Sequence, residues 1–348
     1  MTLTLRHEVL QLPLRDPFRI ARSEHGAGHT TTTLVIELTD SRFPDIVALG
    51  EGYPDKHYGE TVDTMPAVFP MLLAAVGELE PTADGLRAAS LRLEHAIRWN
   101  GAAKCAIDSA ITDLVGKVTG QPAYALLGLS PDIPPTDFTI GIDEPEVVAG
   151  RAQRAGAFPA LKIKCGGPAD IETLRAVRRV YDKPLRVDAN TGWTPETARE
   201  LLPAMVDLGV ELIEQPFPTT RLDWLRDLQQ VSPLPIVADE SCVTMEDLDA
   251  LVGVTAGVNV KLAKCGGPGP AARMLERAKE LGFRRFLGCM EETSVGIAAS
   301  AAAASLADWV DLDGNLLLAD EPFGGLELGS DHRWQLTDAP GLGVQRKA

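Results

Sequence analysis

The chain has 348 residues, 45% of them hydrophobic, which is enough for one barrel-sized domain and a smaller second domain. Its formal charge of −16 and its pI near 4.8 argue against nucleic acid or an anionic membrane as a partner, because both need a basic surface. No segment reaches the ~20 apolar residues of a membrane span, and the first residues lack a signal-peptide core. Five cysteines without CxxC spacing favour reduced thiols, so we expect an acidic cytoplasmic protein.

The N-terminal third combines strands and helices. Strand-like patterns cover residues 2–8 and 30–38, and residues 17–26 between them are typical of a loop. A second loop rich in Gly, Pro and charge covers 50–60. Three helical patterns follow, and the last ends at Gly120-Gln121-Pro122; they cover residues 61–79, 86–99 and 101–119.

From residue 136 onward, strands and helices alternate. Short apolar, β-branched stretches are each followed by a turn and a helical pattern, which is the layout of βα units in a parallel sheet. The eight predicted strands cover residues 136–142, 159–164, 184–188, 210–214, 235–239, 257–261, 284–288 and 309–313. Eight is the strand number of a (β/α) barrel.

Charged residues close five consecutive strands of this series. Lys164, Asp188, Glu214, Asp239 and Lys261 follow one another at intervals of 22 to 26 residues, about one strand-helix unit each. The C-terminal strand ends of a barrel meet at one face, so we expect the five side chains around one pocket.

Three of these residues are carboxylates suited to a divalent cation. Asp188, Glu214 and Asp239 supply hard oxygen ligands and leave positions open for water or substrate, which favours magnesium. Zinc is disfavoured, since no histidine falls among these strands and the cysteines lack ligand spacing. The alternative is that the three are ordinary solvent-facing acids on the barrel rim.

The lysines flank the carboxylate strands. Lys164 precedes them and Lys261 follows them, so the two lysines would face each other across the metal. Two bases on opposite sides of a carbon can invert a stereocentre, and burial, the metal and nearby Lys162 would lower the pKa of such a lysine. The alternative is a pair of surface lysines whose stems lie along apolar neighbours. The segments 162–168 and 261–268 also echo each other, both ending in Lys-Cys-Gly-Gly-Pro.

The combined motifs resemble the enolase superfamily, its muconate-lactonising subgroup, and most closely its dipeptide epimerases. The motifs span nearly the whole chain: Lys162-x-Lys164, Asp188-Ala189-Asn190, Glu214-Gln215-Pro216, Ala238-Asp239-Glu240-Ser241, and Lys261 before Gly266-Gly267. The resemblance implies an α/β fold, a modified TIM barrel (β/α)7β over residues 126–319. It also implies an α+β capping domain over residues 1–125, completed by about 320–348.

The resemblance assigns roles to these residues. Asp188, Glu214 and Asp239 would bind one Mg²⁺ per subunit. Lys164 and Lys261 would exchange the α-proton of the substrate, and Lys162 would stabilise the enolate. Asn190 and Glu240 would support the ligands, with Glu240 near Lys261. Relatives of this kind also lead us to expect a homo-oligomer.

The eighth strand bears on the substrate. Asp311 and Asp313 lie on the same side of that strand, and in dipeptide epimerases an Asp-x-Asp there receives the free α-ammonium of the substrate. N-acylamino-acid racemases, o-succinylbenzoate synthases and muconate-type cycloisomerases remain alternatives, although their substrates have no ammonium to satisfy two buried acids. A helix cap or rim salt bridge for the two acids, and a non-catalytic metal-dependent binding protein, are the remaining alternatives.

Four further residues are substrate-contact candidates: Thr139 on the first strand, Cys289 and Met290 after the seventh strand, and Arg22 in the capping loop. Arg22 favours an acidic side chain such as that of L-Ala-D/L-Glu, and Lys56, His57 and Tyr58 offer a second anion contact. Hydrophobic and basic side chains on the dipeptide remain open.

Overall fold

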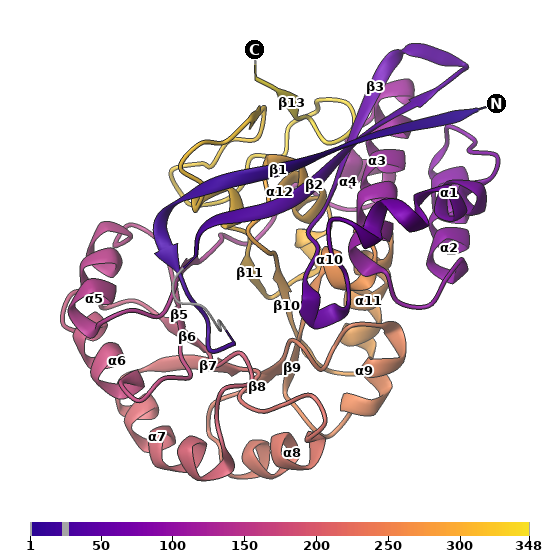
Figure 1. The fold of residues 1–348 in the computed structure, drawn as a ribbon. Helices are drawn as coiled ribbons and strands as arrows, with labels where there is room; N and C mark the ends of the chain where they lie inside the picture. Colours follow the sequence, from indigo (N-terminus) through magenta and orange to yellow (C-terminus); the bar gives the residue numbers. More distant parts are fainter. Residues whose placement is uncertain (1, 23–27, 348) are drawn as a thin grey trace.

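The computed structural model describes residues 2–22 and 28–347, and it begins with a three-stranded antiparallel sheet (Figure 1). The sheet consists of β1 (Leu3–Phe18), β2 (Gly28–Asp40) and β3 (Phe43–Gly52), in that order. The prediction of a strand that stops at residue 8 was wrong. β1 pairs with β2 without a break from Leu3 to Pro13, so partner hydrogen bonds sustain a strand with few buried side chains of its own.

The expected loops also need correction. Residues 17 and 18 still belong to β1, and residues 23–26 of that predicted loop lie outside the described residues. The strand β3 was not predicted at all, and it includes residues 50–52 of the second expected loop. A Cβ on Gly50 would lie 2.0 Å from the carbonyl oxygen of Ala106, so the glycine lets β3 lie directly against a helix.

Four helices complete the N-terminal region: α1 (Thr64–Val76), α2 (Ala83–His95), α3 (Gly101–Thr119) and α4 (Ala123–Leu126). The Thr82 side chain accepts the N–H of Gly85 and starts α2 three residues before the predicted position. The helix α3 is buried over most of its length, and its small residues permit the close contact with β3.

The second sheet is an eight-stranded parallel barrel, which confirms the predicted fold class. Its strands follow chain order around the sheet, and a bridge between Thr136 and Val310 joins the first strand to the last. The strands are β4 (Phe138–Ile140), β5 (Leu161–Lys164), β6 (Leu185–Asp188), β7 (Val210–Glu214), β8 (Ile236–Ala238), β9 (Gly257–Lys261), β10 (Arg284–Gly288) and β11 (Trp309–Asp311).

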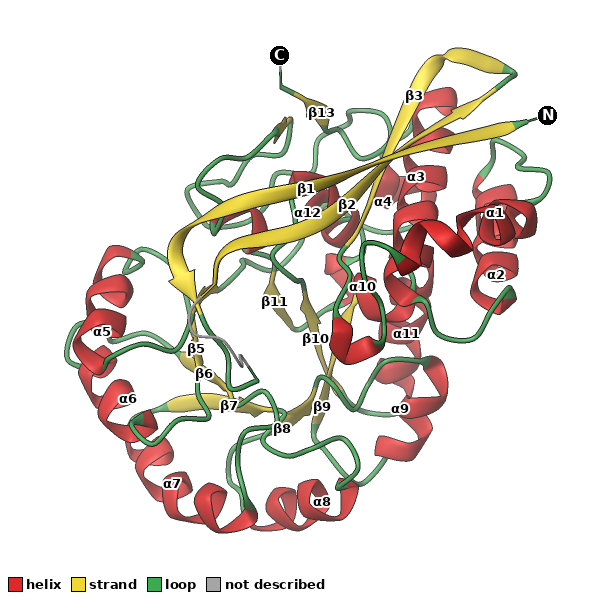
Figure 2. Ribbon diagram, in the orientation of Figure 1, coloured by secondary structure: helices red, strands yellow, loops and turns green. Residues whose placement is uncertain are grey.

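Figure 2 shows the barrel helices around these strands. One helix leads from each strand to the next, so the order is (β/α)7β; β9 is followed by a short helix before its longer one. The helices are α5 (Pro145–Arg154), α6 (Asp170–Arg178), α7 (Pro195–Asp207), α8 (Leu222–Val231), α9 (Met245–Leu251), α10 (Leu262–Cys265), α11 (Pro268–Glu280) and α12 (Ser294–Ala301). No helix within the described ranges is both long and apolar enough to cross a membrane.

The N-terminal sheet lies across the barrel (Figure 1). Past the main β1–β2 ladder, Leu14 forms a bridge with Leu318, and the carbonyl of Arg19 accepts the N–H of Ile142, just after β4. The C-terminal segment, with β12 (Phe323–Gly324) and β13 (Gln345–Arg346), contacts the N-terminal region: Leu342 N–H donates to Asp113 on α3 at 2.8 Å. These contacts fix residues of the first 60 over the C-terminal strand ends.

Candidate active site

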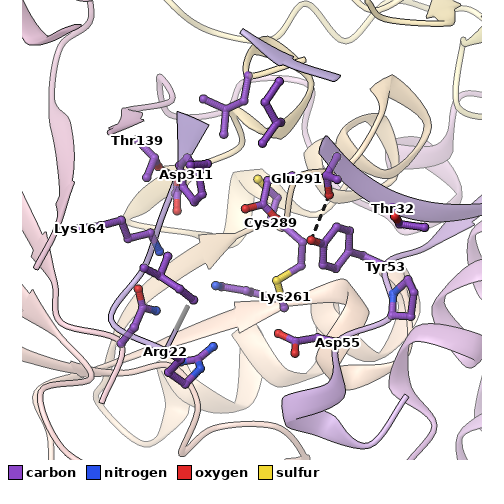
Figure 3. A pocket seen from close by; sticks show the side chains of 18 of the residues that line it. Arg22, Thr32, Tyr53, Asp55, Thr139, Lys164, Lys261, Cys289, Glu291 and Asp311 are labelled. Carbon is purple, nitrogen blue, oxygen red and sulfur yellow. Dashed lines mark hydrogen bonds between the residues drawn. The ribbon is translucent and has the colours of Figure 1, made fainter. Parts of the chain in front are cut away.

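Three of the five charged strand-end residues, Lys164, Asp239 and Lys261, line one cavity of about 580 Å³. Carboxylate oxygens of Asp188 and Glu214 lie within 4.8 Å of one from Asp239. Lys164 is in register with Asp188, and Asp188 with Glu214, on three adjacent strands, while Asp239 directly follows β8. Lys261 ends β9. Figure 3 shows Lys164 and Lys261 entering this cavity with their amines directed toward one another. The structure therefore brings together all five strand-end residues that the sequence singled out.

Three carboxylates form a compact ligand set. One oxygen from each of Asp188, Glu214 and Asp239 lies within 4.8 Å of the others, and all three side chains are buried. Three hard oxygen donors at this spacing fit one Mg²⁺-sized cation with room for further ligands. Burial and the charge of Asp188 raise the pKa of Glu214 to about 7. Burial acts in the same direction on Asp188, but Lys164 and Lys162 outweigh it and lower the pKa of that group.

Each lysine has a defined carboxylate partner. Lys164 Nζ lies 2.7 Å from Asp188 Oδ2, and Lys261 Nζ lies 2.9 Å from Asp239 Oδ2. Lys162 Nζ lies 2.8 Å from Glu214 Oε2 and 3.3 Å from Asp188 Oδ2, and only 1% of its side chain is exposed. Each amine is thus held at the edge of the carboxylate group.

The surroundings of Lys261 act in both directions on its pKa. Burial lowers it, Asp239 raises it and Lys162 lowers it again, but the sum with the other carboxylates raises the pKa above the ordinary lysine value. The sequence argument expected a lowered pKa with the metal present. In the carboxylate field alone the net direction is upward, so neutralisation of these carboxylates decides how readily Lys261 gives up a proton.

A second polar cluster lies at the junction of β11 and β4. Asp311 Oδ1 accepts the hydroxyl of Thr139 at 3.0 Å, and Asp311 Oδ2 lies 2.8 Å from Lys162 Nζ. Asp313 Oδ2 accepts the N–H of Thr139 at 2.5 Å. The sequence analysis missed Asp137, which is buried beside Asp311 and pairs with Arg186 Nη1 at 2.8 Å. Asp137 directly precedes β4, so its position in the chain gave no strand-end signal.

Charge does not balance within this cluster. Three buried carboxyl groups, Asp137, Asp311 and Asp313, face the two cations Lys162 and Arg186. Burial and the adjacent Asp311 raise the pKa of Asp313 to about 8. The same two causes raise the pKa of Asp137. The cluster therefore has room for one more positive charge.

The capping loop enters the site through Arg22. Its guanidinium forms an ion pair with Glu240, and Glu240 Oε1 also accepts the amide of Asn190 at 3.2 Å. The amide of Asn190 reaches Asp188 Oδ2 at 3.3 Å. Glu240 was expected near Lys261, but its hydrogen-bond partners in the described ranges are Arg22 and Asn190. Arg22 lines the cavity, with its charge already matched.

Two other residues that the sequence gave no role support the ligands. Lys264 Nζ lies 2.6 Å from Asp239 Oδ1 and 2.9 Å from the carbonyl of Asn259, and Asn259 Nδ2 donates to Glu214 Oε1 at 2.7 Å. The similarity of segments 162–168 and 261–268 is the sequence signal that could have identified Lys264, because Lys264 occupies the position that Lys164 has in the first segment. α10 turns it to the side of Asp239.

Cys289 and Met290 line the same cavity, together with Thr139, Asp311 and Asp313. Burial raises the pKa of the Cys289 thiol, and all five cysteines of the chain are free. The cap contributes Tyr53 and Asp55 to the wall, together with Lys56 and Tyr58 from the short helix Lys56–Tyr58. The site therefore combines three carboxylates between two lysines with the adjacent cluster of Asp137, Asp311 and Asp313, which can accept one more positive charge.

Comparison with known proteins agrees with this geometry. The model for "Mandelate racemase / muconate lactonizing enzyme, N-terminal domain" matches residues 8–128, and the "Enolase C-terminal domain-like" model matches residues 146–347. The chain belongs to the enolase superfamily. Its place there is with the mandelate racemase and muconate lactonizing enzymes, as the sequence motifs predicted.

Several relatives of this chain are named as epimerases. The L-Ala-D/L-Glu epimerase of Bacteroides thetaiotaomicron is 36% identical over 97% of this chain and 86% of its own length. The L-Lys-D/L-Arg epimerase of Methylococcus capsulatus is 34% identical over 95% of both. A crystal structure of the dipeptide epimerase of Enterococcus faecalis V583, complexed with Mg and L-Leu-L-Tyr, gives a TM-score of 0.89 at 31% identity, covering 99% of this chain and 100% of that one.

Proposed function

We propose that this protein is a Mg²⁺-dependent dipeptide epimerase that inverts the α-carbon of the C-terminal residue by proton transfer between two lysines. The observation that carries the proposal is the unbalanced cluster of Asp137, Asp311 and Asp313 beside an opposed lysine pair. A dipeptide has one free α-ammonium to complete that cluster. Its C-terminal carboxylate then extends toward Asp188, Glu214 and Asp239.

Three carboxylates form the proposed metal site. Asp188, Glu214 and Asp239 would hold Mg²⁺, which supplies positive charge that acidifies the α-carbon next to the substrate carboxylate. One such ion per subunit fits this single ligand set.

The side chains of the protein perform the proton transfer. Lys164 on β5 and Lys261 on β9 approach from opposite sides, so one removes the α-proton and the other returns a proton to the opposite face. Lys162 lies between the ligand set and Asp311 and places a positive charge beside the negative charge that develops on the substrate. The proton balance is zero, and the reaction is reversible.

N-acylamino-acid racemisation is the nearest alternative within the superfamily. An N-acyl substrate brings a neutral amide to the Asp311 and Asp313 cluster, so Asp313 keeps its proton and the cluster gains no ionic partner. The geometry therefore favours a free ammonium.

Deuterium entry tests the proposal. The Mg²⁺-loaded protein is incubated in D₂O with a library of L,L-dipeptides in which both residues vary and, separately, with the N-acetylated amino acids. We expect a mass gain of one deuterium per molecule in a subset of dipeptides. Exchange confined to the N-acetylated set would replace dipeptide epimerisation by N-acylamino-acid racemisation, and no exchange in either set would overturn the enzyme assignment.

A further inference from the structure

One wall of the substrate cavity carries acidic groups that the proposed chemistry does not use. Tyr53 and Asp55 follow the end of β3, and Glu291 follows β10; all three line the cavity and are partly exposed. Figure 3 shows them on the side of Lys261, away from Lys164. The hydroxyl of Tyr53 accepts from Thr31 at 3.1 Å, and burial together with the charge of Glu291 raises the pKa of Tyr53 well above the ordinary tyrosine value. Glu291 therefore lies near the Tyr53 hydroxyl in this wall.

Most charged groups of the cavity have a partner of opposite sign. Asp239 and Asp311 face lysines, and Arg22 faces Glu240. Within residues 2–22 and 28–347, Glu291 and Asp55 form no ion pair. Asp55 caps the short helix Lys56–Tyr58 through the N–H of His57, and Lys56 beside it is exposed. Glu291 thus brings a negative charge to the cavity that no cation of the described residues neutralises.

Glu291 follows the strand that neighbours the one carrying Asp311, a member of the cluster proposed to bind the substrate ammonium. Gly288, three residues earlier, is in register with Asp311 on the adjacent strand β11. A dipeptide whose ammonium lies at Asp311 and Asp313 places its N-terminal residue beside this strand end. The side chain nearest to Glu291 is then that of the N-terminal residue.

We propose that the preferred dipeptides carry a basic side chain on the N-terminal residue, with Glu291 as its ionic acceptor. The inference rests on the proposed function and specifies its substrate class. Both oxygens of Glu291 can accept hydrogen bonds from an ammonium or guanidinium group. A hydrophobic side chain would bury Glu291 without a cation, and an acidic one would add a like charge.

The substrates for the test differ only at the N-terminal side chain. L-Lys-L-Ala, L-norleucyl-L-Ala and L-Glu-L-Ala are compared with the Mg²⁺-loaded protein by deuterium entry at the alanine α-carbon. Norleucine keeps the length of lysine but lacks its charge. We expect kcat/KM to be at least about tenfold higher for the lysyl than for the norleucyl dipeptide, and lowest for the glutamyl one.

Glu291→Gln tests the residue itself. It should bring the lysyl dipeptide down to the level of the norleucyl one, while kcat/KM for the norleucyl dipeptide stays within about threefold. Glu200→Gln, on the exposed face of α7, is the matched control and should change none of the three values.

The outcomes separate this inference from the proposed function. If the wild-type protein processes the norleucyl or glutamyl dipeptide as well as the lysyl one, the proposed preference for a basic side chain is wrong and the epimerase function still stands. An unchanged lysine preference in Glu291→Gln overturns the role of that residue. No exchange with any dipeptide, in these three or in the wider library, overturns the proposed function first.

Discussion

Lys162 connects the proposed metal ligands to the carboxylates proposed to bind the substrate ammonium. Its amine lies within 3.3 Å of three carboxylates, those of Asp188, Glu214 and Asp311, and it therefore joins the metal ligands to the ammonium cluster. Burial lowers its pKa, but these carboxylates outweigh burial and raise it well above the usual lysine value. A cation that keeps its proton is suited to stabilise charge, whereas Lys164 and Lys261 reach the open cavity.

Removal of either cavity lysine should stop epimerisation. Lys164→Ala and Lys261→Ala are each expected to lower kcat for dipeptide epimerisation by about a thousandfold or more, because the transfer needs a base on one face and an acid on the other. Circular dichroism during turnover, together with single-turnover deuterium exchange, measures the effect. A variant with full turnover would exclude the two-lysine scheme.

Substrate binding should depend on pH through Asp313. Its pKa is raised to about 8 by burial and by Asp311, so below that pH an incoming ammonium must displace a proton. KM should therefore rise as pH falls from 8 to 6, by up to about tenfold per unit. Above about pH 8 the dipeptide itself loses its ammonium charge. Asp313→Asn keeps an oxygen for the Thr139 N–H and should flatten the KM profile below pH 8; an unchanged profile would show that Asp313 does not titrate on binding.

At the scale of single residues, the sequence predicted the site residues that end a strand. It missed the residues that join the site only through contacts in the folded structure. Asp188, Glu214 and Lys261 each end a short apolar run, so position alone marked them. Asp137 precedes its strand, and Asn259 lies inside one, so neither carried such a signal. The match between Arg22 and Glu240 joins segments 218 residues apart, and no local pattern encodes it.

At the scale of elements, the barrel strands were predictable and the cap strands were not. The barrel strands are short and largely buried, and β-branched or other apolar residues recur in them between turns, which gives them a local signature. β1 and β3 owe their length to pairing with β2, and their exposed residues hide that pairing in the sequence. α3 was placed correctly because Gly120 marks its end, whereas α2 begins three residues before its predicted start, at the Thr82 cap that the prediction did not use.

One such unpredicted element, β3, anchors the cap to the barrel through Glu51. The Glu51 carboxylate accepts the hydroxyl of Thr293 at 2.6 Å and the N–H of Gly296 at 2.8 Å, at the start of α12, and also the hydroxyl of Thr33 on β2. Because this buried carboxylate accepts hydrogen bonds from both the cap and the barrel, it holds the two regions together.

Glu51→Ala should therefore destabilise the protein by about 3 kcal/mol, because several buried donors lose their acceptor. Glu51→Gln keeps an acceptor oxygen and should cost less than about 1 kcal/mol. Urea unfolding followed by fluorescence measures both. Equal losses in the two variants would mean that the negative charge, not the acceptor geometry, holds the cap.

At the scale of the whole molecule, ligand set and fold depend on each other. Asp188, Glu214 and Asp239 come from three separate strands, so their oxygens lie within 4.8 Å only when the barrel is closed. An unfolded chain has no such site, and a cation that binds only the folded state must stabilise it.

Mg²⁺ should accordingly raise the melting temperature. At one hundred times its dissociation constant the ion adds about 2.7 kcal/mol, and a chain of this length should gain roughly 4 °C. Differential scanning calorimetry with and without EDTA measures the shift. Asp239→Asn removes one ligand charge and should reduce the shift to less than about 1 °C at the same Mg²⁺ concentration. Glu200→Gln, on the outer surface, should keep the full shift. A shift retained in Asp239→Asn would place the stabilising ion elsewhere on this strongly acidic protein, since surface carboxylates bind Mg²⁺ without regard to the barrel.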